Sequence, residues 1–130
     1  MASRSFHSDS CPGIGHVEID FSLVPQGAAS PLGGEGTSGN FVTWARTGTG
    51  TYTITTVDKY LAVVAQSYGL VLATPIANWN IQPGAPVQNA NGTWTLTFTS
   101  YLSAVATDIP LAAGNTISCY CRFRNSTVKP

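Results

Sequence analysis

Thr93-Trp94-Thr95-Leu96-Thr97-Phe98-Thr99 is the stretch of sequence that decides the fold. Large apolar side chains alternate here with threonine, and a period of two is the repeat of a β-strand. Threonine and aromatic residues also favour strands, because branched and ring side chains fit a pleated surface. The alternation therefore predicts a half-buried strand in which Trp94, Leu96 and Phe98 face a core and the threonines face outward.

Two further stretches, residues 16–23 and residues 117–124, alternate in the same way. We expect each to be a strand with one face in the core. The inward residues are Val17, Ile19, Phe21 and Leu23 in the first strand, and Ile117, Cys119, Cys121 and Phe123 in the last. The outward residues are His16, Glu18, Asp20 and Ser22, and Ser118, Tyr120, Arg122 and Arg124.

Turn residues mark the ends of the remaining strands. Thr47-Gly48-Thr49-Gly50 separates two β-rich runs, residues 41–46 and 51–56, and predicts a hairpin with Tyr52 and Ile54 facing inward. Asn91-Gly92 predicts a type I′ turn just before the deciding strand. Further strands are expected at 60–65, 70–74 and 76–82, the first two separated at Gly69 and buried on both faces.

No segment carries a helical repeat over three turns, so the chain is expected to be all-β. Roughly seven to nine short strands divided by Gly, Pro and Asn turns predict an antiparallel β-sandwich, with a jelly roll as the topology. Residues 1–15 are small and polar and are expected to form an extended N-terminal arm. Residues 16–130 are then one β-sandwich domain, with a long glycine-rich loop at residues 25–40.

Charge is scarce and balanced in this chain. Of its 130 residues only 9% are charged, against about 25% in an average domain, and six basic residues offset six acidic ones. A nucleic-acid binder needs a clustered basic face, and a polybasic membrane anchor needs the same, so we expect neither partner. The N-terminal residues lack the apolar region of a secretion signal, and no apolar run is long enough to span a membrane.

The sequence offers little catalytic chemistry. No Gly-x-Ser-x-Gly elbow is present, and the Cys119-x-Cys121 spacing is a poor fit to a zinc site, so we expect no enzyme, metal or cofactor. All three cysteines are expected to be reduced thiols, two of them packed in the core. Glu18 and Asp20 lie two apart on one strand face and are interpreted as part of its polar face rather than as a catalytic pair.

Candidate partner contacts are Arg4 and Phe6 in the arm, and Tyr120, Arg122 and Arg124 on the outward face of the last strand. Arginine and tyrosine are both enriched at protein interfaces. The three tryptophans at positions 44, 79 and 94 could line a carbohydrate platform, but core or interface packing is the favoured interpretation.

Two stretches carry a resemblance to a known group of proteins. Arg46-Thr47-Gly48-Thr49-Gly50-Thr51-Tyr52-Thr53-Ile54-Thr55 forms one, and residues 108–127, with the arginine-flanked strand before Asn125-Ser126, form the other. The chain resembles small bacteriophage virion proteins, and among them the capsid decoration (cement) proteins of tailed phages. Similar Gly-Thr hairpins occur in phage tail-fibre tips and in C1q-like trimers.

The resemblance implies a jelly-roll fold, oligomerisation on the viral shell and no catalysis, and it carries over no individual site residue. We accordingly expect a decoration protein, made in the host cytoplasm and located on the capsid surface, whose partner is the major capsid protein. Residues 1–40 are expected to grip the shell while the sandwich contacts other copies in a trimer or dimer. The alternative is a tail-fibre or receptor-binding tip of a phage.

Overall fold

The computed structural model describes residues 15–124. Its strands are β1 (His16–Gln26), β2 (Ala29–Gly33), β3 (Val42–Gly48), β4 (Thr51–Thr56), β5 (Ala62–Val71), β6 (Trp79–Pro83), β7 (Val87–Gln88), β8 (Trp94–Leu102), β9 (Val105–Ala106) and β10 (Thr116–Arg124). A single 3-10 turn, η2 (Thr37–Gly39), is the one helical element in this part of the chain.

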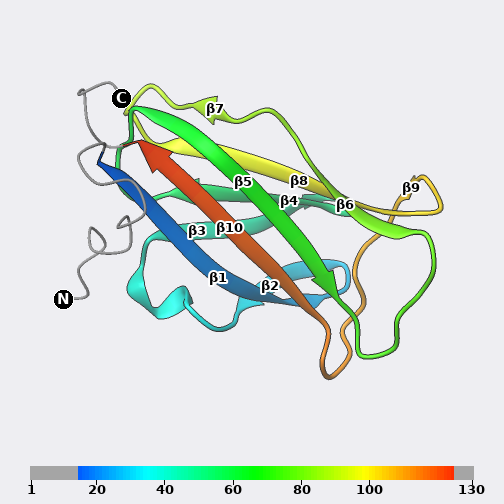
Figure 1. The fold of residues 1–130 in the computed structure, drawn as a ribbon. Coiled ribbons are helices and arrows are strands. Elements are labelled where there is room, and N and C mark those ends of the chain that lie inside the picture. The colour runs from blue at the N-terminus through cyan, green and yellow to red at the C-terminus, as the bar shows by residue number, and fades with distance from the viewer. Residues whose placement is uncertain (1–14, 125–130) are drawn as a thin grey trace.

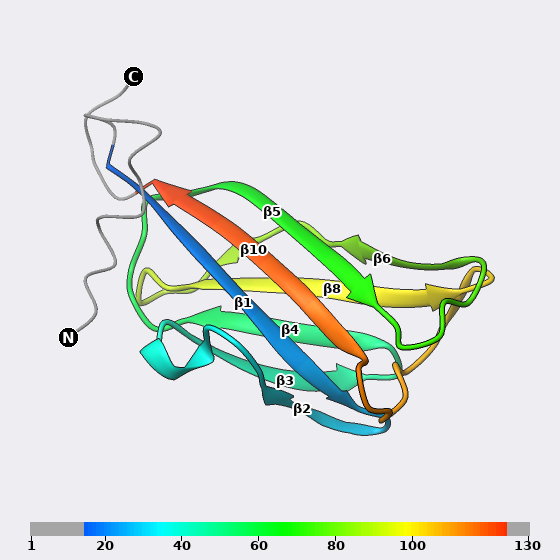
Figure 2. The ribbon, with the colours of Figure 1, turned by 60° about the horizontal axis from the view of Figure 1, so that its bottom comes forward.

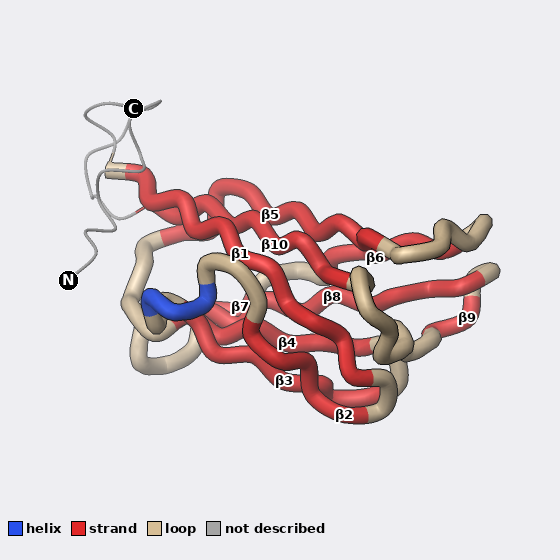
Figure 3. Tube along the Cα trace, turned by 90° about the horizontal axis from the view of Figure 1, so that it is seen from below, coloured by secondary structure: helices blue, strands red, loops and turns tan. Residues whose placement is uncertain are grey.

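The strands form two sheets that pack face to face, as Figure 3 shows. Sheet A has the order β2-β1-β10-β5, and sheet B has the order β3-β4-β8-β6, with β7 and β9 also paired to β8 (Figure 1). Every strand pair is antiparallel. The prediction of an all-β, antiparallel sandwich is confirmed.

The core lies between the two sheets and consists of the residues that the alternation places inward. The predicted inward residues of β1 and β10 are all buried, as are Tyr52, Ile54, Leu96 and Phe98. Trp94 is only partly buried and packs against this cluster. Two core residues, Tyr60 and Ile109, come from connections between strands and have no periodic pattern that predicts them.

Stacked aromatic rings join the two sheets. The Phe98 ring lies 4.3 Å from the Tyr68 ring of sheet A and 5.5 Å from the Tyr52 ring beside it in sheet B, measured between ring centroids. Tyr60 stacks on Phe123 at 4.4 Å. Buried aromatic pairs add stabilisation beyond their buried area, and the Tyr68–Phe98 pair does so between the two sheets.

The predicted loop at residues 25–40 is only partly correct: residues 34–41 contain no strand, but β2 forms before them. β1 continues to Gln26, turns at Gly27 with a positive φ of 64°, and returns as β2 before the short turn η2. The glycines that suggested a loop instead allow close packing: a Cβ at Gly36 would lie 2.6 Å from the carbonyl oxygen of Asp20. This segment is bonded to β1, since Ser22 N donates to Glu35 O and Gly34 N donates to Ser22 O.

The prediction of two strands separated at Gly69 is wrong. β5 runs without interruption through Gly69, which lies opposite Ser118 of β10 at an outward position. β5 is the last strand of its sheet and is not buried on both faces; Val64 and Val71 are 47% and 49% exposed. Glycine keeps its backbone N–H and C=O, so the hydrogen-bonded ladder with β10 continues through Gly69 and the strand does not end there.

Two turn predictions need correction. The β7–β8 hairpin forms where expected, but only Gly92 has a positive φ, whereas a type I′ turn needs two such residues. The loop is one residue longer: Asn89 N donates to Thr93 O, and Gly92 N donates to Asn89 O.

The strand expected at 76–82 begins three residues later, at Trp79, after Asn78 takes a left-handed conformation. The predicted arm, residues 1–15, lies outside the described residues except for Gly15.

Candidate functional site

The outer face of sheet B is a nearly continuous surface of threonine. The register places outward residues of β3, β4 and β8 in rows, such as Thr43-Thr55-Thr95, and all of them except Ala45 are threonine. A bulge after Arg46 puts Gly48 opposite Thr51, and Thr47 completes the grid through its hydroxyl contact with Thr53. We call this grid the threonine face: residues 43, 45, 47, 51, 53, 55, 95, 97 and 99. Neighbouring side chains lie about 4.8 Å apart across strands and about 6.7 Å apart along them.

The threonine face carries hydroxyl and methyl groups and no charge. Some hydroxyls bond to each other, as in Thr47–Thr53 at 3.2 Å and Thr51–Thr99 at 3.4 Å. The adjoining strand β6 continues the face with two amides, Asn80 and Gln82. Among the described residues, this side of the sandwich can therefore be covered by another surface without desolvating an ionised group.

The outer face of sheet A is the charged side of the molecule. The predicted contacts Tyr120, Arg122 and Arg124 lie together on it, with Glu18 directly opposite Arg122. Arg122 Nε is 3.9 Å from Glu18 Oε1, and both side chains are mostly buried. Burial, with the nearby carboxylate of Glu18, raises the pKa of Tyr120. Arg4 and Phe6, the other predicted contacts, lie outside the described residues.

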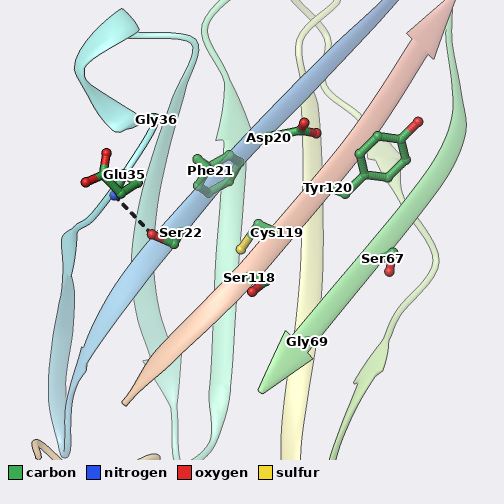
Figure 4. A pocket seen from close by; sticks show the side chains of 10 residues that line it. All are labelled: Asp20, Phe21, Ser22, Glu35, Gly36, Ser67, Gly69, Ser118, Cys119 and Tyr120. Atoms are coloured by element: carbon green, nitrogen blue, oxygen red, sulfur yellow. Dashed lines mark hydrogen bonds between the residues drawn. The ribbon is translucent and has the colours of Figure 1, made fainter. Parts of the chain in front are cut away.

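A shallow groove of about 630 Å³ crosses the same face (Figure 4). Exposed Glu35 lies at one side of the groove, Ser67 and Gly69 of β5 lie at the other, and Asp20 and Tyr120 lie together at one end. Its lining residues are Asp20, Phe21, Ser22, Glu35, Gly36, Ser67, Gly69, Ser118, Cys119 and Tyr120. Sequence reasoning missed Glu35, because its approach to β1 depends on the β2 fold-back, in which Glu35 N donates to Ser22 Oγ at 3.0 Å.

An ion pair fastens one end of the sandwich. Arg46 donates from Nε and Nη2 to the two oxygens of Asp108, at 2.8 Å and 2.9 Å, and Gly50 N donates to Asp108 Oδ1 at 2.8 Å. The hydrogen bond from Arg46 and the Gly50 N–H hold the pKa of Asp108 below its usual value. These bonds tie the β3–β4 hairpin to the connection that leads into β10, so the pair is structural.

The described cysteines are core residues rather than nucleophiles. Cys119 and Cys121 are free thiols, 4% and 0% exposed, which confirms the prediction for these two. Burial raises the pKa of Cys119 and raises that of Cys121 to about 12. A buried thiol that stays protonated near neutral pH cannot attack a substrate. The third cysteine, Cys11, lies outside the described residues.

The tryptophans pack against the core, as predicted, and form no common platform. Each indole N–H is bonded within the fold: Trp44 to Pro31 O, Trp79 to Ser100 Oγ and Trp94 to Tyr60 O. Each ring thus contributes buried area and one directional bond.

Over residues 15–124, no cluster of three or more His, Cys, Asp or Glu side chains could hold a metal ion. The same part of the chain has no helix with the length and apolar character needed to cross a membrane. Comparison with protein-family models, with curated proteins and with solved structures finds no match to this chain.

Proposed function

We propose that this chain is a non-enzymatic capsid decoration protein that binds the outside of a viral shell and bridges major capsid protein subunits. The threonine face is the observation that carries the proposal, together with the resemblance of the sequence to phage virion proteins. An uncharged sheet face can lie against another protein at little electrostatic cost, whereas each desolvated charge costs several kcal/mol unless it is paired.

The threonine face is too small to form a stable complex alone. A grid of three strands by three positions covers roughly 300 Å². A stable complex buries about 800 Å² on each partner. The proposed attachment therefore needs more contacts, and residues 1–15 of the same chain are the proposed source. Binding of several linked copies would raise the apparent affinity further.

The strand order supports the jelly-roll part of the proposal. A jelly roll winds a ribbon of paired strands, so that the first strand lies beside the last and the second beside the next to last. When the edge strands β2 and β3 and the two-residue strands β7 and β9 are set aside, β1 lies beside β10 and then β5, and β4 lies beside β8 and then β6 (Figure 2). This is the order expected of a jelly roll that lacks the outermost strand of each sheet.

Co-sedimentation with purified capsids tests the proposal. A charge at the centre of the threonine face, introduced as Thr97→Lys or Thr97→Glu, should weaken binding at least tenfold with either sign. Matched controls are Ser118→Lys and Ser118→Glu, which place the same charges at an outward position of sheet A and should bind like the wild type. Removal of residues 1–15 should also reduce binding. Undiminished binding by both Thr97 variants would refute the assignment of this face.

A receptor-binding tip is the second candidate, and the groove on sheet A favours it. An aromatic ring at Tyr120, the carboxylates of Asp20 and Glu35, and serine hydroxyls are groups that bind sugars. Both carboxylates are exposed and the groove is shallow, so the groove does not exclude the bulk water that weakens the electrostatic action of catalytic groups, and binding suits it better than hydrolysis. Saturable glycan binding that Tyr120→Ala abolishes and Thr97→Lys leaves unchanged would favour the tip over the decoration protein.

A further inference from the structure

The two sides of the sandwich are closed differently. On one side, β2 of sheet A is tied to β3 of sheet B, because Trp44 Nε1 donates to Pro31 O at 2.8 Å and Arg46 N donates to Ser30 Oγ at 3.1 Å. On the other side, β5 ends sheet A, and no strand among the described residues pairs with its outer edge (Figure 2). The side-chain amide of Gln66 makes a bond across this side, to Gly84 O.

The hydrogen-bond pattern identifies the backbone groups along that edge. Ser22, an outward residue of β1, directs both its N–H and its C=O toward the β2 side. In an antiparallel sheet these directions alternate along each strand, so the inward residues of β1 bond to β10 and the outward residues of β10 bond to β5. The bond from Leu61 N to outward Arg124 O agrees with this pattern.

It follows that Ala65, Ser67 and Gly69, opposite the outward residues of β10, bond to that strand. Gln66, Tyr68 and Leu70 therefore direct their N–H and C=O groups away from the sheet. Within residues 15–124 β5 pairs with β10 alone, so these six groups have no strand partner inside the fold. They make a regular row of three donors and three acceptors.

The edge of β5 lacks the features that usually prevent an edge strand from pairing with a strand of another chain. Natural edges carry lysine or proline, or are covered or twisted away by bulges. β5 contains no charged residue and no proline over ten residues, and its bulge, at Val64, lies near one end. The opposite edge strand, β2, contains Pro31 and is bonded to β3. Only one of the two edges of sheet A is therefore protected.

We propose that β5 pairs with β5 of a second copy, antiparallel about a two-fold axis, and joins two copies of sheet A into one eight-stranded sheet. Antiparallel pairing of identical strands is self-complementary, since each donor on one copy meets an acceptor on the other. Pairing over Ala65–Val71 would satisfy all three donors and all three acceptors of each copy. The outward side chains Ala65, Ser67 and Gly69 are small and uncharged, so two copies meet without repulsion.

This inference specifies the homo-oligomer of the proposed function, but its test uses the free protein and needs no capsid. Light scattering after gel filtration should give twice the chain mass for the wild type and for Gln66→Ala. Gln66→Pro should give the monomer mass with an unchanged far-ultraviolet circular dichroism spectrum. Both variants lose the side-chain amide of Gln66. Only proline also removes the backbone N–H of residue 66, which points away from β10, so the bonds between β5 and β10 stay in place.

Amide hydrogen exchange of the wild type supplies a second readout that needs no variant to fold. Dilution below the dissociation constant should accelerate exchange at Gln66, Tyr68 and Leu70 at least tenfold and leave Ser67 and Gly69 unchanged. A monomeric or trimeric wild type, a dimeric Gln66→Pro, or exchange without this alternation would overturn the proposal. A monomer whose capsid binding is lost in Gln66→Pro would also overturn it, and would assign the edge to a strand of the shell.

Discussion

Replacing Phe98 by alanine tests the central packing of the sandwich. Phe98 is fully buried, and its ring stacks on Tyr68 and Tyr52. Truncating a buried phenylalanine costs about 3–5 kcal/mol, from the lost transfer free energy and the cavity left behind. Two lost aromatic contacts, each worth about 0.5–1.5 kcal/mol, place this site at the upper end of that range. We therefore expect a loss of about 4–5 kcal/mol.

That loss is a large share of the total stability. A chain of this length has an unfolding free energy of roughly 6–20 kcal/mol, so Phe98→Ala should still fold at 25 °C but unfold at much lower denaturant concentration. With a urea dependence of about 2 kcal/mol/M, the unfolding midpoint should fall by roughly 2 M. The readout is equilibrium urea unfolding followed by tryptophan fluorescence and by circular dichroism.

Thr97→Ala is the matched control for this experiment. Thr97 is the neighbouring residue on the same strand, but it points outward onto the threonine face. Its replacement should cost no more than about 1 kcal/mol, the span of strand propensity. If both variants shift the midpoint by similar amounts, or if Phe98→Ala loses less than about 1 kcal/mol, the assignment of inward and outward faces in β8 is wrong.

The remaining predictions concern turns, an ion pair and thiols. Gly50 and Gly92 both have positive φ, but a Cβ at Gly50 would lie 2.6 Å from the Thr107 backbone nitrogen, whereas at Gly92 it meets a flexible lysine side chain at 3.3 Å. Gly92→Ala should cost about 1–2 kcal/mol and Gly50→Ala several kcal/mol more in urea unfolding; equal costs would contradict the close packing. Because the pKa of Asp108 is lowered in the folded state, its stabilisation is complete above the ordinary value of 3.8 and is lost as the pH falls through the lower folded-state pKa. Asp108→Asn should thus be less stable than the wild type at pH 7, and the difference in unfolding free energy should become smaller in acid. A difference that does not change with pH would argue against the ion pair. Finally, Cys119 and Cys121 should resist iodoacetamide at pH 8 until urea is added, as peptide mapping by mass spectrometry will show, and rapid labelling of either in the native protein would contradict their burial.

The periodic strands could be predicted because alternate residues of a half-buried strand face the core and the outside, and therefore differ in polarity. Phe98 and Thr97 differ in polarity because one faces the core and the other faces outward, and the same holds for Cys121 and Arg122. No partner strand is needed to make that distinction, so the sandwich and most of its core follow from local pattern alone.

Two of the predictions that failed depended on contacts between distant residues. The glycines of residues 25–40 indicate a loop until β1 is present for them to pack against, and Gly69 indicates a break until its pairing with β10 is known. The left-handed conformations that favour glycine can be guessed locally. Whether a glycine is there for such a conformation or for close packing is decided by its neighbours in space.

The sequence alone determined the fold class, the faces of β1, β8 and β10, and the scarcity of charge, because each of these is a property of residues close together in the chain. The tertiary structure decided what those strands form together. Strand order and register gathered the threonines of three strands into one uncharged face, brought Glu35 beside the groove, and left β5 at an open edge. Register is set by packing between residues far apart in sequence, so no local pattern contains these surfaces.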